Sequence, residues 1–207
     1  MGDDRRVPTL IQPGLPAGAL AAAPQPTIVG AGVSLRPWSE ADLPTIVAAY
    51  ADPEIQRWHG MSVDRAEAME LLTSWRSGWA LETAASWAVV DPASGRPLGR
   101  AALREIDLLD ARAEIGYWVL PAARRRGVAT ASVLALVDWA FGEGFHRLDL
   151  MHSTRNALSC RVATAAGLVL EGTLRGFGRH ADGPHDMHVH ARLSDDPIRV
   201  GPARAMT

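Results

Sequence analysis

Apolar residues recur along this chain with two different spacings, and each spacing predicts one type of element. Between residues 130 and 142 they return every three or four positions, as on the core-facing side of a helix that Gly142 and Gly144 end. Shorter apolar runs, bounded by turn-forming residues, predict strands at 33–36, 86–90, 97–106, 113–120, 148–151, 168–179 and 185–193. Further helices are predicted at 39–50, 53–58, 63–83 and 156–166.

The order of these elements predicts an α+β fold with a mixed, mostly antiparallel central sheet flanked by helices. Early strands are followed by a helix, a strand, a helix and a closing hairpin. Residues 1–32 are rich in Pro, Gly and Ala without a clear period, so we expect a flexible or surface-draped N-terminal arm. The domain itself is expected at 33–195, followed by a C-terminal tail at 196–207.

Composition limits the class of protein further. The chain of 207 residues is 47% hydrophobic, enough for a sizeable core, and its formal net charge of −2 provides no overall attraction to nucleic acid. Cys160 is the only cysteine, so an internal disulfide is excluded and a reducing cytoplasm is expected. No apolar run approaches the length of a membrane span, and none reads as a signal peptide. We therefore expect a cytoplasmic protein without a nucleic-acid or membrane partner.

The most informative local feature is an arginine-rich loop between a predicted strand and a predicted helix. Arg124, Arg125 and Arg126 precede Gly127, and the helix follows. The first turn of a helix carries unpaired N–H groups and the positive end of the helix dipole, which together favour an anion. Glycine lets the backbone approach that anion closely. The P-loop and dinucleotide-binding patterns do not match, so the residues alone fit either a phosphate site or a solvated basic loop.

Several motifs together resemble the GNAT superfamily of N-acetyltransferases. The spacing Arg124-x-x-Gly127-x-Ala129 is similar to the acyl-CoA loop of that superfamily. Residues 116–121 (Gly-Tyr-Trp-Val-Leu-Pro), the motif Asn156-x-x-Ser159 and residues 166–172 are similar to the branch that includes ribosomal-protein N-terminal-alanine acetyltransferases. The resemblance extends over nearly the whole chain, and it implies a GNAT-like fold with acetyl-CoA as co-substrate and a primary amine as acceptor.

The resemblance also implies where acetyl-CoA lies. Backbone groups of Trp118, Val119 and Leu120 would bond the pantetheine arm, because this strand splays from the next one in the family. The pyrophosphate would lie on the loop and first helical turn, formed by Arg124, Arg125, Arg126, Gly127, Val128, Ala129 and Thr130. Which arginine side chain pairs with a phosphate stays open. Asn156, the only asparagine, is implied to contact the cofactor arm, whereas its residue type also fits a helix N-cap.

Two residues are expected to carry the chemistry. Glu114 resembles the catalytic glutamate of the superfamily's protein-lysine acetyltransferases, and a carboxylate there could take the proton of the amine. A surface ion pair at a sheet edge is the alternative. Ser159 is implied to lie near the thioester sulfur, where its hydroxyl could protonate the leaving thiolate. The glutamate that is usual in the N-terminal-alanine branch is missing, because Gly178 stands at about its position.

The closing hairpin gathers histidines and aspartates. His188 and His190 share one face of a predicted strand but lack a cysteine or a clear second ligand pair, so we expect no metal site there. In the family this hairpin borders the acceptor cleft, which implies that His180 and Asp186 face the substrate.

The sequence therefore predicts an acetyl-CoA-dependent N-acetyltransferase in which the amine attacks directly within a ternary complex. The acceptor is expected to be a protein or peptide N-terminus, or a small amine such as an antibiotic or amino acid. The chain is expected to be a monomer or homodimer. Two alternatives stay open: a non-catalytic acyl-CoA-binding sensor, and an acyltransferase that uses a longer acyl-CoA.

Overall fold

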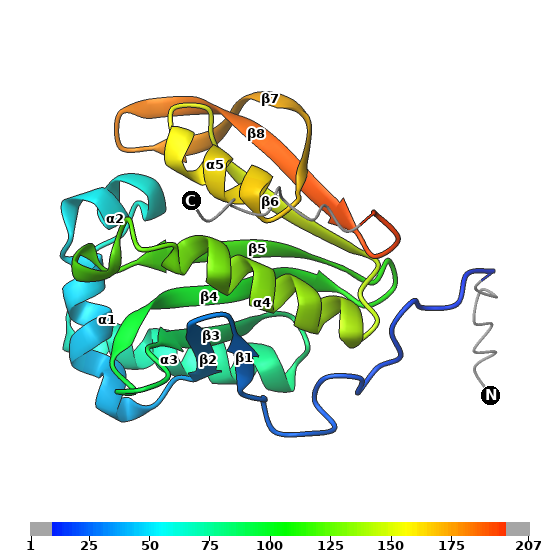
Figure 1. Ribbon diagram of the computed structural model, residues 1–207, viewed down its shortest axis with the longest axis horizontal. Helices are drawn as coiled ribbons and strands as arrows, with labels where there is room; N and C mark the ends of the chain where they lie inside the picture. The colour runs from blue at the N-terminus through cyan, green and yellow to red at the C-terminus, as the bar shows by residue number, and fades with distance from the viewer. Residues whose placement is uncertain (1–9, 198–207) are drawn as a thin grey trace, which may run out of the picture.

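The computed structural model describes residues 10–197 and shows an eight-stranded sheet with helices on both faces (Figure 1). The strands are β1 (Ile28–Gly30), β2 (Val33–Pro37), β3 (Ala85–Val90), β4 (Pro97–Asp107), β5 (Arg112–Val119), β6 (Arg147–Ser153), β7 (Val169–His180) and β8 (Gly183–Leu193). The helices are α1 (Leu43–Tyr50), α2 (Pro53–His59), α3 (Arg65–Ala80), α4 (Val128–Gly142) and α5 (Ala157–Ala165), with 3₁₀ turns at Glu40–Asp42 and Pro121–Ala123. The expected C-terminal tail falls outside the described residues from position 198 onward.

The strands follow the order β1-β2-β3-β4-β5-β6-β8-β7, and all neighbours are antiparallel except β5 and β6. A parallel pair needs a long crossover connection, which α4 provides between these two strands. The predicted α+β class with a mixed, mostly antiparallel sheet is confirmed. No helix within residues 10–197 combines the length and the apolar character needed to cross a membrane.

The sheet opens between β5 and β6. These strands pair over three positions only, and the last pair joins Glu114 to Asp149. Beyond this point β5 stays paired with β4, while β6 stays paired with β8 (Figure 1). The two strands therefore diverge, and the backbone groups of β5 that face β6 lose their ladder partners.

Two hydrophobic clusters fill the two faces of the sheet. On the face covered by α4, Ile115 and Leu103 pack with the helix residue Leu136. On the other face, Trp118 packs with residues of α1, α2 and α3, of which Ile46 and Leu72 are fully buried. Because successive side chains of β5 alternate between these faces, Tyr117 and Trp118 belong to different environments.

The segment before residue 33 is attached more firmly than its composition predicts. Leu15 and Leu20 are buried in the core, and Ile28–Gly30 forms the edge strand β1. The Glu82 carboxylate accepts hydrogen bonds of 2.6, 2.7 and 3.2 Å from the N–H groups of residues 18, 20 and 21. The packed domain therefore begins before the expected boundary at residue 33. The sequence did not predict this attachment, because the carboxylate that anchors the segment lies about sixty residues away in sequence.

Truncation of one anchoring side chain tests this attachment. Leu20→Ala should lower the free energy of unfolding by about 2–5 kcal/mol, because it leaves a cavity in the core. Urea denaturation measures the change. Leu10→Ala is the matched control, since that side chain is 96% exposed and its loss should cost less than about 0.5 kcal/mol. Equal stability of the two variants would show that the segment contributes nothing to the core.

Candidate active site

The loop before α4 presents a row of backbone amides. Gly127 caps the helix in a left-handed conformation (φ 76°), and Arg125 is also left-handed (φ 59°). None of the N–H groups of residues 125–130 hydrogen bonds to another described residue. Space is open where a Cβ would project from Gly127. Six amides at the positive end of a helix fit the predicted pyrophosphate site.

Arg124 differs from its expected role, because its guanidinium is already engaged. It pairs with Asp52 and with Glu54 (3.0 Å), and its Nε donates to the Val119 carbonyl oxygen at 3.2 Å. Burial raises the pKa of Asp52, but the hydrogen bond from Arg124, the Arg124 charge and hydrogen bonds from the backbone N–H groups of residues 54 and 55 together leave that pKa below its ordinary value. Arg124 thus fastens the loop to the start of α2, and a phosphate would meet the exposed Arg125 and Arg126.

Strand β5 offers fewer backbone groups to the opening than predicted. The Leu120 N–H donates to the Leu98 carbonyl at 2.9 Å, and Trp118 stands opposite Arg100 in the ladder with β4. Backbone groups of successive residues point to opposite edges of a strand, so Val119 and Tyr117 direct theirs toward the opening. Of the three residues predicted to bond the pantetheine arm, Val119 alone keeps this orientation.

A hydrogen bond spans the opening between β5 and α5. The Tyr117 hydroxyl donates to Ser159 Oγ at 3.0 Å, and Ser159 is 6% exposed. Burial raises the pKa of Tyr117, so the phenol stays protonated and remains a donor near neutral pH. Since Ser159 accepts this bond, its own hydrogen can point to a reacting sulfur. The sequence did not single out Tyr117 as a site residue.

Asn156 stands at the start of α5 in the geometry of an N-cap. Its side-chain oxygen accepts a hydrogen bond of 3.1 Å from the Ser159 N–H. The capping function is therefore present, and it fixes the helix turn that carries Ser159. Contact of the Asn156 amide with a cofactor remains a prediction, since the capping bond leaves its two N–H donors uncommitted.

Glu114 lies where the opening begins, on the face opposite to Ser159. It pairs with Arg104, its cross-strand neighbour on β4. Burial raises the pKa of Glu114 above its ordinary value, the Arg104 charge opposes this shift, and the nearby carboxylates of Glu105 and Asp149 add to it. A partly buried carboxylate with a raised pKa has the property required of a general base near neutral pH.

Two further residues that the sequence did not single out share the face of Glu114. Burial, reinforced by the charges of Arg100 and Arg104, lowers the pKa of His59 to about 4, so its imidazole is neutral. Arg100 is 9% exposed, donates to Ser86 Oγ at 2.8 Å, and lies 4.7 Å above the ring of Trp75. Burial lowers the pKa of Arg100 to about 10, which leaves it cationic. Because arginine is abundant in the chain, nothing in the sequence singles out Arg100.

The hairpin residues predicted to face the substrate have different surroundings. His180 stacks on His185 at 4.1 Å and meets Trp58 of α2 edge-on at 6.0 Å. Asp186 accepts a 2.7 Å hydrogen bond from the Gly176 N–H, which fixes an irregular part of β7. His180 thus lies against α2, whereas Asp186 holds its own hairpin together.

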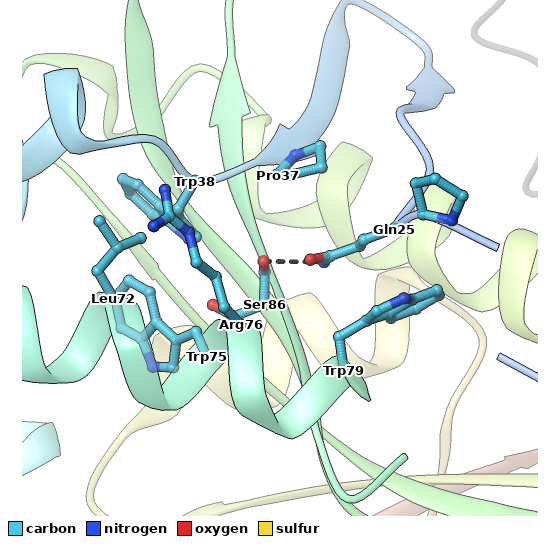
Figure 2. Close-up of a pocket in the computed structure, with 9 residues that line it drawn as sticks. Gln25, Pro37, Trp38, Leu72, Trp75, Arg76, Trp79 and Ser86 are labelled. Carbon is cyan, nitrogen blue, oxygen red and sulfur yellow. Dashed lines mark hydrogen bonds between the residues drawn. The ribbon is translucent and has the colours of Figure 1, made fainter. Parts of the chain in front are cut away.

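A pocket of about 290 Å³ lies beneath α3 and is lined by side chains that include Trp38, Trp75 and Trp79 (Figure 2). Gln25 crosses it and donates to the Ser86 carbonyl oxygen at 3.0 Å. None of the residues predicted to bind acetyl-CoA or the acceptor lines this pocket. It belongs to the face of Arg100 and is distinct from the loop at Gly127.

Residues 33–169 match the family described as the acetyltransferase (GNAT) domain. The match covers more than half of the chain, and the chain therefore belongs to this family of acetyltransferases. The enzyme transfers an acetyl group from acetyl-CoA to an amine.

Individual relatives agree with this assignment. The chain is 23% identical over 160 residues to an uncharacterised N-acetyltransferase, YoaA, of Bacillus subtilis, covering 76% of this chain and 90% of that protein. It is 28% identical over 99 residues to the ribosomal-protein-serine acetyltransferase of Escherichia coli, covering 47% and 55%. The solved structure of RimL, a ribosomal α-N-protein acetyltransferase in complex with coenzyme A, has a TM-score of 0.75 at 18% identity, covering 81% and 98%.

A charge placed in the loop tests the phosphate site. Gly127→Asp should weaken coenzyme A binding about 10- to 100-fold, the loss expected for one charge-assisted contact of about 1.5–3 kcal/mol. Isothermal titration calorimetry measures the affinity. Gly32→Asp is the matched control, because Gly32 is exposed, has a similar φ of 74° and lies in a different turn. Unchanged affinity in Gly127→Asp would remove the loop from the site.

The hydrogen bond between Tyr117 and Ser159 is tested by a double-mutant cycle. Ser159→Ala should lower kcat by about 10²-fold, the lower range for loss of a positioned proton donor. Tyr117→Phe should have a smaller effect, because it leaves the serine hydroxyl in place. The double variant should be no slower than Ser159→Ala alone, since both changes affect one donor. Fully multiplicative effects on kcat would show that the two residues act independently.

Proposed function

We propose that the amine attacks acetyl-CoA directly within a ternary complex, with Glu114 as general base and Ser159 as proton donor to the departing sulfur. The observation that carries this proposal is the opening between β5 and β6. Glu114 borders it on one face of the sheet, and Ser159 borders it on the other. An amine and a thioester that approach from opposite faces would meet there.

The chemistry follows from these positions. As the amine nitrogen forms its bond to the acetyl carbon, its proton passes to the Glu114 carboxylate, directly or through water. The bond between carbon and sulfur then breaks, and the thiolate takes a proton from Ser159. Tyr117, which already donates to Ser159 Oγ, would return a proton to it, and exchange with solvent would then reprotonate Tyr117 and remove the amine proton from Glu114. Holding both reactants in one opening supplies the orientation that direct transfer requires.

The acceptor is a protein or peptide N-terminus or a small amine. The resemblance to ribosomal-protein acetyltransferases supports the first class. The surroundings of Glu114 restrict which acceptors of either class would bind. Arg100 is buried on the same face and has no carboxylate partner among the described residues. A buried guanidinium favours an acceptor that carries an acidic group near its amine. A screen of amines with and without such a group, read out by thiol release, distinguishes the classes.

The remaining predictions concern compartment and assembly. We infer a cytoplasmic enzyme, supported by its single cysteine, Cys160. A monomer or homodimer without nucleic acid fits the small net charge of −2. A non-catalytic sensor for acyl-CoA would bind coenzyme A and release no thiol with any amine in the screen.

Replacement of the proposed base gives the most specific kinetic test. Glu114→Gln should lower kcat by about 10²- to 10⁴-fold, because the amide cannot accept the amine proton. The affinity for acetyl-CoA should stay unchanged, since Glu114 lies on the opposite face from Ser159. Glu143→Gln is the matched control: this glutamate is exposed at the C-terminal end of α4, and its loss should leave kcat nearly unchanged.

The pH dependence provides a second readout of the same variant. Because burial raises the pKa of Glu114, activity should rise with pH through a value above that of an ordinary glutamate. Glu114→Gln should lose this acidic limb of the profile. If the variant keeps both the limb and a normal kcat, another group or a water chain takes the proton.

A further inference from the structure

Four potential metal ligands from three elements converge beneath α5. They are His152 of β6, Cys160 of α5, and His188 and His190 of β8, and one ligand atom from each lies within 4.8 Å of the others. Cys160 Sγ is 3.8 Å from His190 Nε2. The reason given above for excluding a metal, that the histidines lack a cysteine and a second ligand pair, is therefore wrong. The strand pairing of β6 with β8 places His152 directly opposite His188.

Three ring nitrogens of this cluster are buried and lack a hydrogen-bond partner among the described residues, which is unusual for buried polar atoms. Within residues 10–197, six buried side-chain nitrogen or oxygen atoms have no hydrogen-bond partner, and three of the six are His152 Nε2, His188 Nδ1 and His190 Nδ1. His152 is 5% exposed and His190 1% exposed. A buried polar atom without a hydrogen-bond partner is destabilising, so three of them in neighbouring rings require a physical explanation.

His152 is oriented as metal-binding histidines are. Its Nδ1 lies 2.8 Å from the Ser153 carbonyl oxygen, and since a carbonyl can only accept, Nδ1 carries the hydrogen. This leaves the lone pair of Nε2 directed at the cluster. A ligating histidine almost always donates its other ring N–H to a carbonyl or carboxylate in this way.

We propose that His152, Cys160, His188 and His190 form a tetrahedral site for a divalent transition metal ion, with zinc preferred. Imidazole nitrogen and thiolate sulfur are both ligand types that zinc prefers, and the four residues together supply the four donors of a tetrahedral site. Zinc bonds of about 2.0–2.3 Å place tetrahedral ligand atoms about 3.3–3.8 Å apart, so the observed cluster needs only a small contraction. Binding releases the thiol proton of Cys160 to solvent, because the thiolate is the ligand.

The site has a structural role, since all four tetrahedral positions come from the protein and none is left for a substrate. The metal would join α5 to β6 and β8. Cys160 directly follows Ser159, and Asn156 begins the same helix. Metal binding would therefore fix the helix turn that carries the proposed proton donor. The metal site does not depend on the proposed mechanism, because its ligands include none of the reacting groups.

Cobalt substitution tests the proposal directly. Untagged protein is treated with chelator, dialysed and titrated with Co²⁺, whose absorption reports tetrahedral geometry and thiolate ligation. We expect saturation at one Co²⁺ per chain, with a charge-transfer band that Cys160→Ser abolishes. His188→Asn should weaken binding at least about tenfold. Added Zn²⁺ should raise the melting temperature of the unmodified protein by several degrees and that of the two variants much less.

The control is His146→Asn, because His146 is exposed and lies outside the cluster. It should bind Co²⁺ as the unmodified protein does. Circular dichroism of the metal-free variants shows whether they fold. If Cys160→Ser does not fold, His188→Asn alone provides the test. The proposal is overturned if the protein shows no saturable Co²⁺ binding up to about millimolar concentration. It is equally overturned if the spectrum persists in the folded cluster variants.

Discussion

The separation of β5 from β6 is the constraint on which the rest of this structure depends. After three pairs the strands diverge, and backbone groups that a continuous sheet would satisfy must find other partners. The Val119 carbonyl oxygen accepts a hydrogen bond from Arg124, and Arg124 in turn joins the loop before α4 to the start of α2. The hydroxyl groups of Tyr117 and Ser159 bridge the gap on one face. One local departure from regular pairing thus places Glu114 and Ser159 beside a single opening, on the strand that leads into the loop before α4 and on the helix that faces it.

Most of the fold could be predicted from local patterns. The α4 helix and the strands before it follow from apolar spacing and from glycine and proline at their ends, and the observed bounds differ by a few residues. The N-terminal segment could not be predicted in this way. Its anchoring depends on Glu82, and on Trp79 and Trp87, whose indoles donate to the Ala23 and Pro26 carbonyls; these contacts are distant in sequence. The composition of this segment shows that its apolar residues lack a regular spacing, but it does not show whether the segment packs against the domain.

The site shows the same limit. The loop at Gly127 and the position of Glu114 could be predicted, because a strand, a loop and a helix follow one another in the chain. The engagement of Arg124 by Asp52 could not, since the two residues are 72 positions apart. The histidine cluster was misjudged for the same reason. Alternation along β8 showed that His188 and His190 share a face, but only the β6–β8 pairing and the docking of α5 bring His152 and Cys160 to them.

Hydrogen–deuterium exchange with and without coenzyme A tests the central claim most directly, because it reports where the ligand protects backbone amides. Protection by coenzyme A should be found at the opening between β5 and β6 and in the loop that follows β5. The amides of residues 125–130, which lack partners among the described residues, and that of Val119 should exchange more slowly with the ligand bound. Protection confined to the pocket lined by Trp38 and Trp75, with residues 125–130 unchanged, would contradict the account.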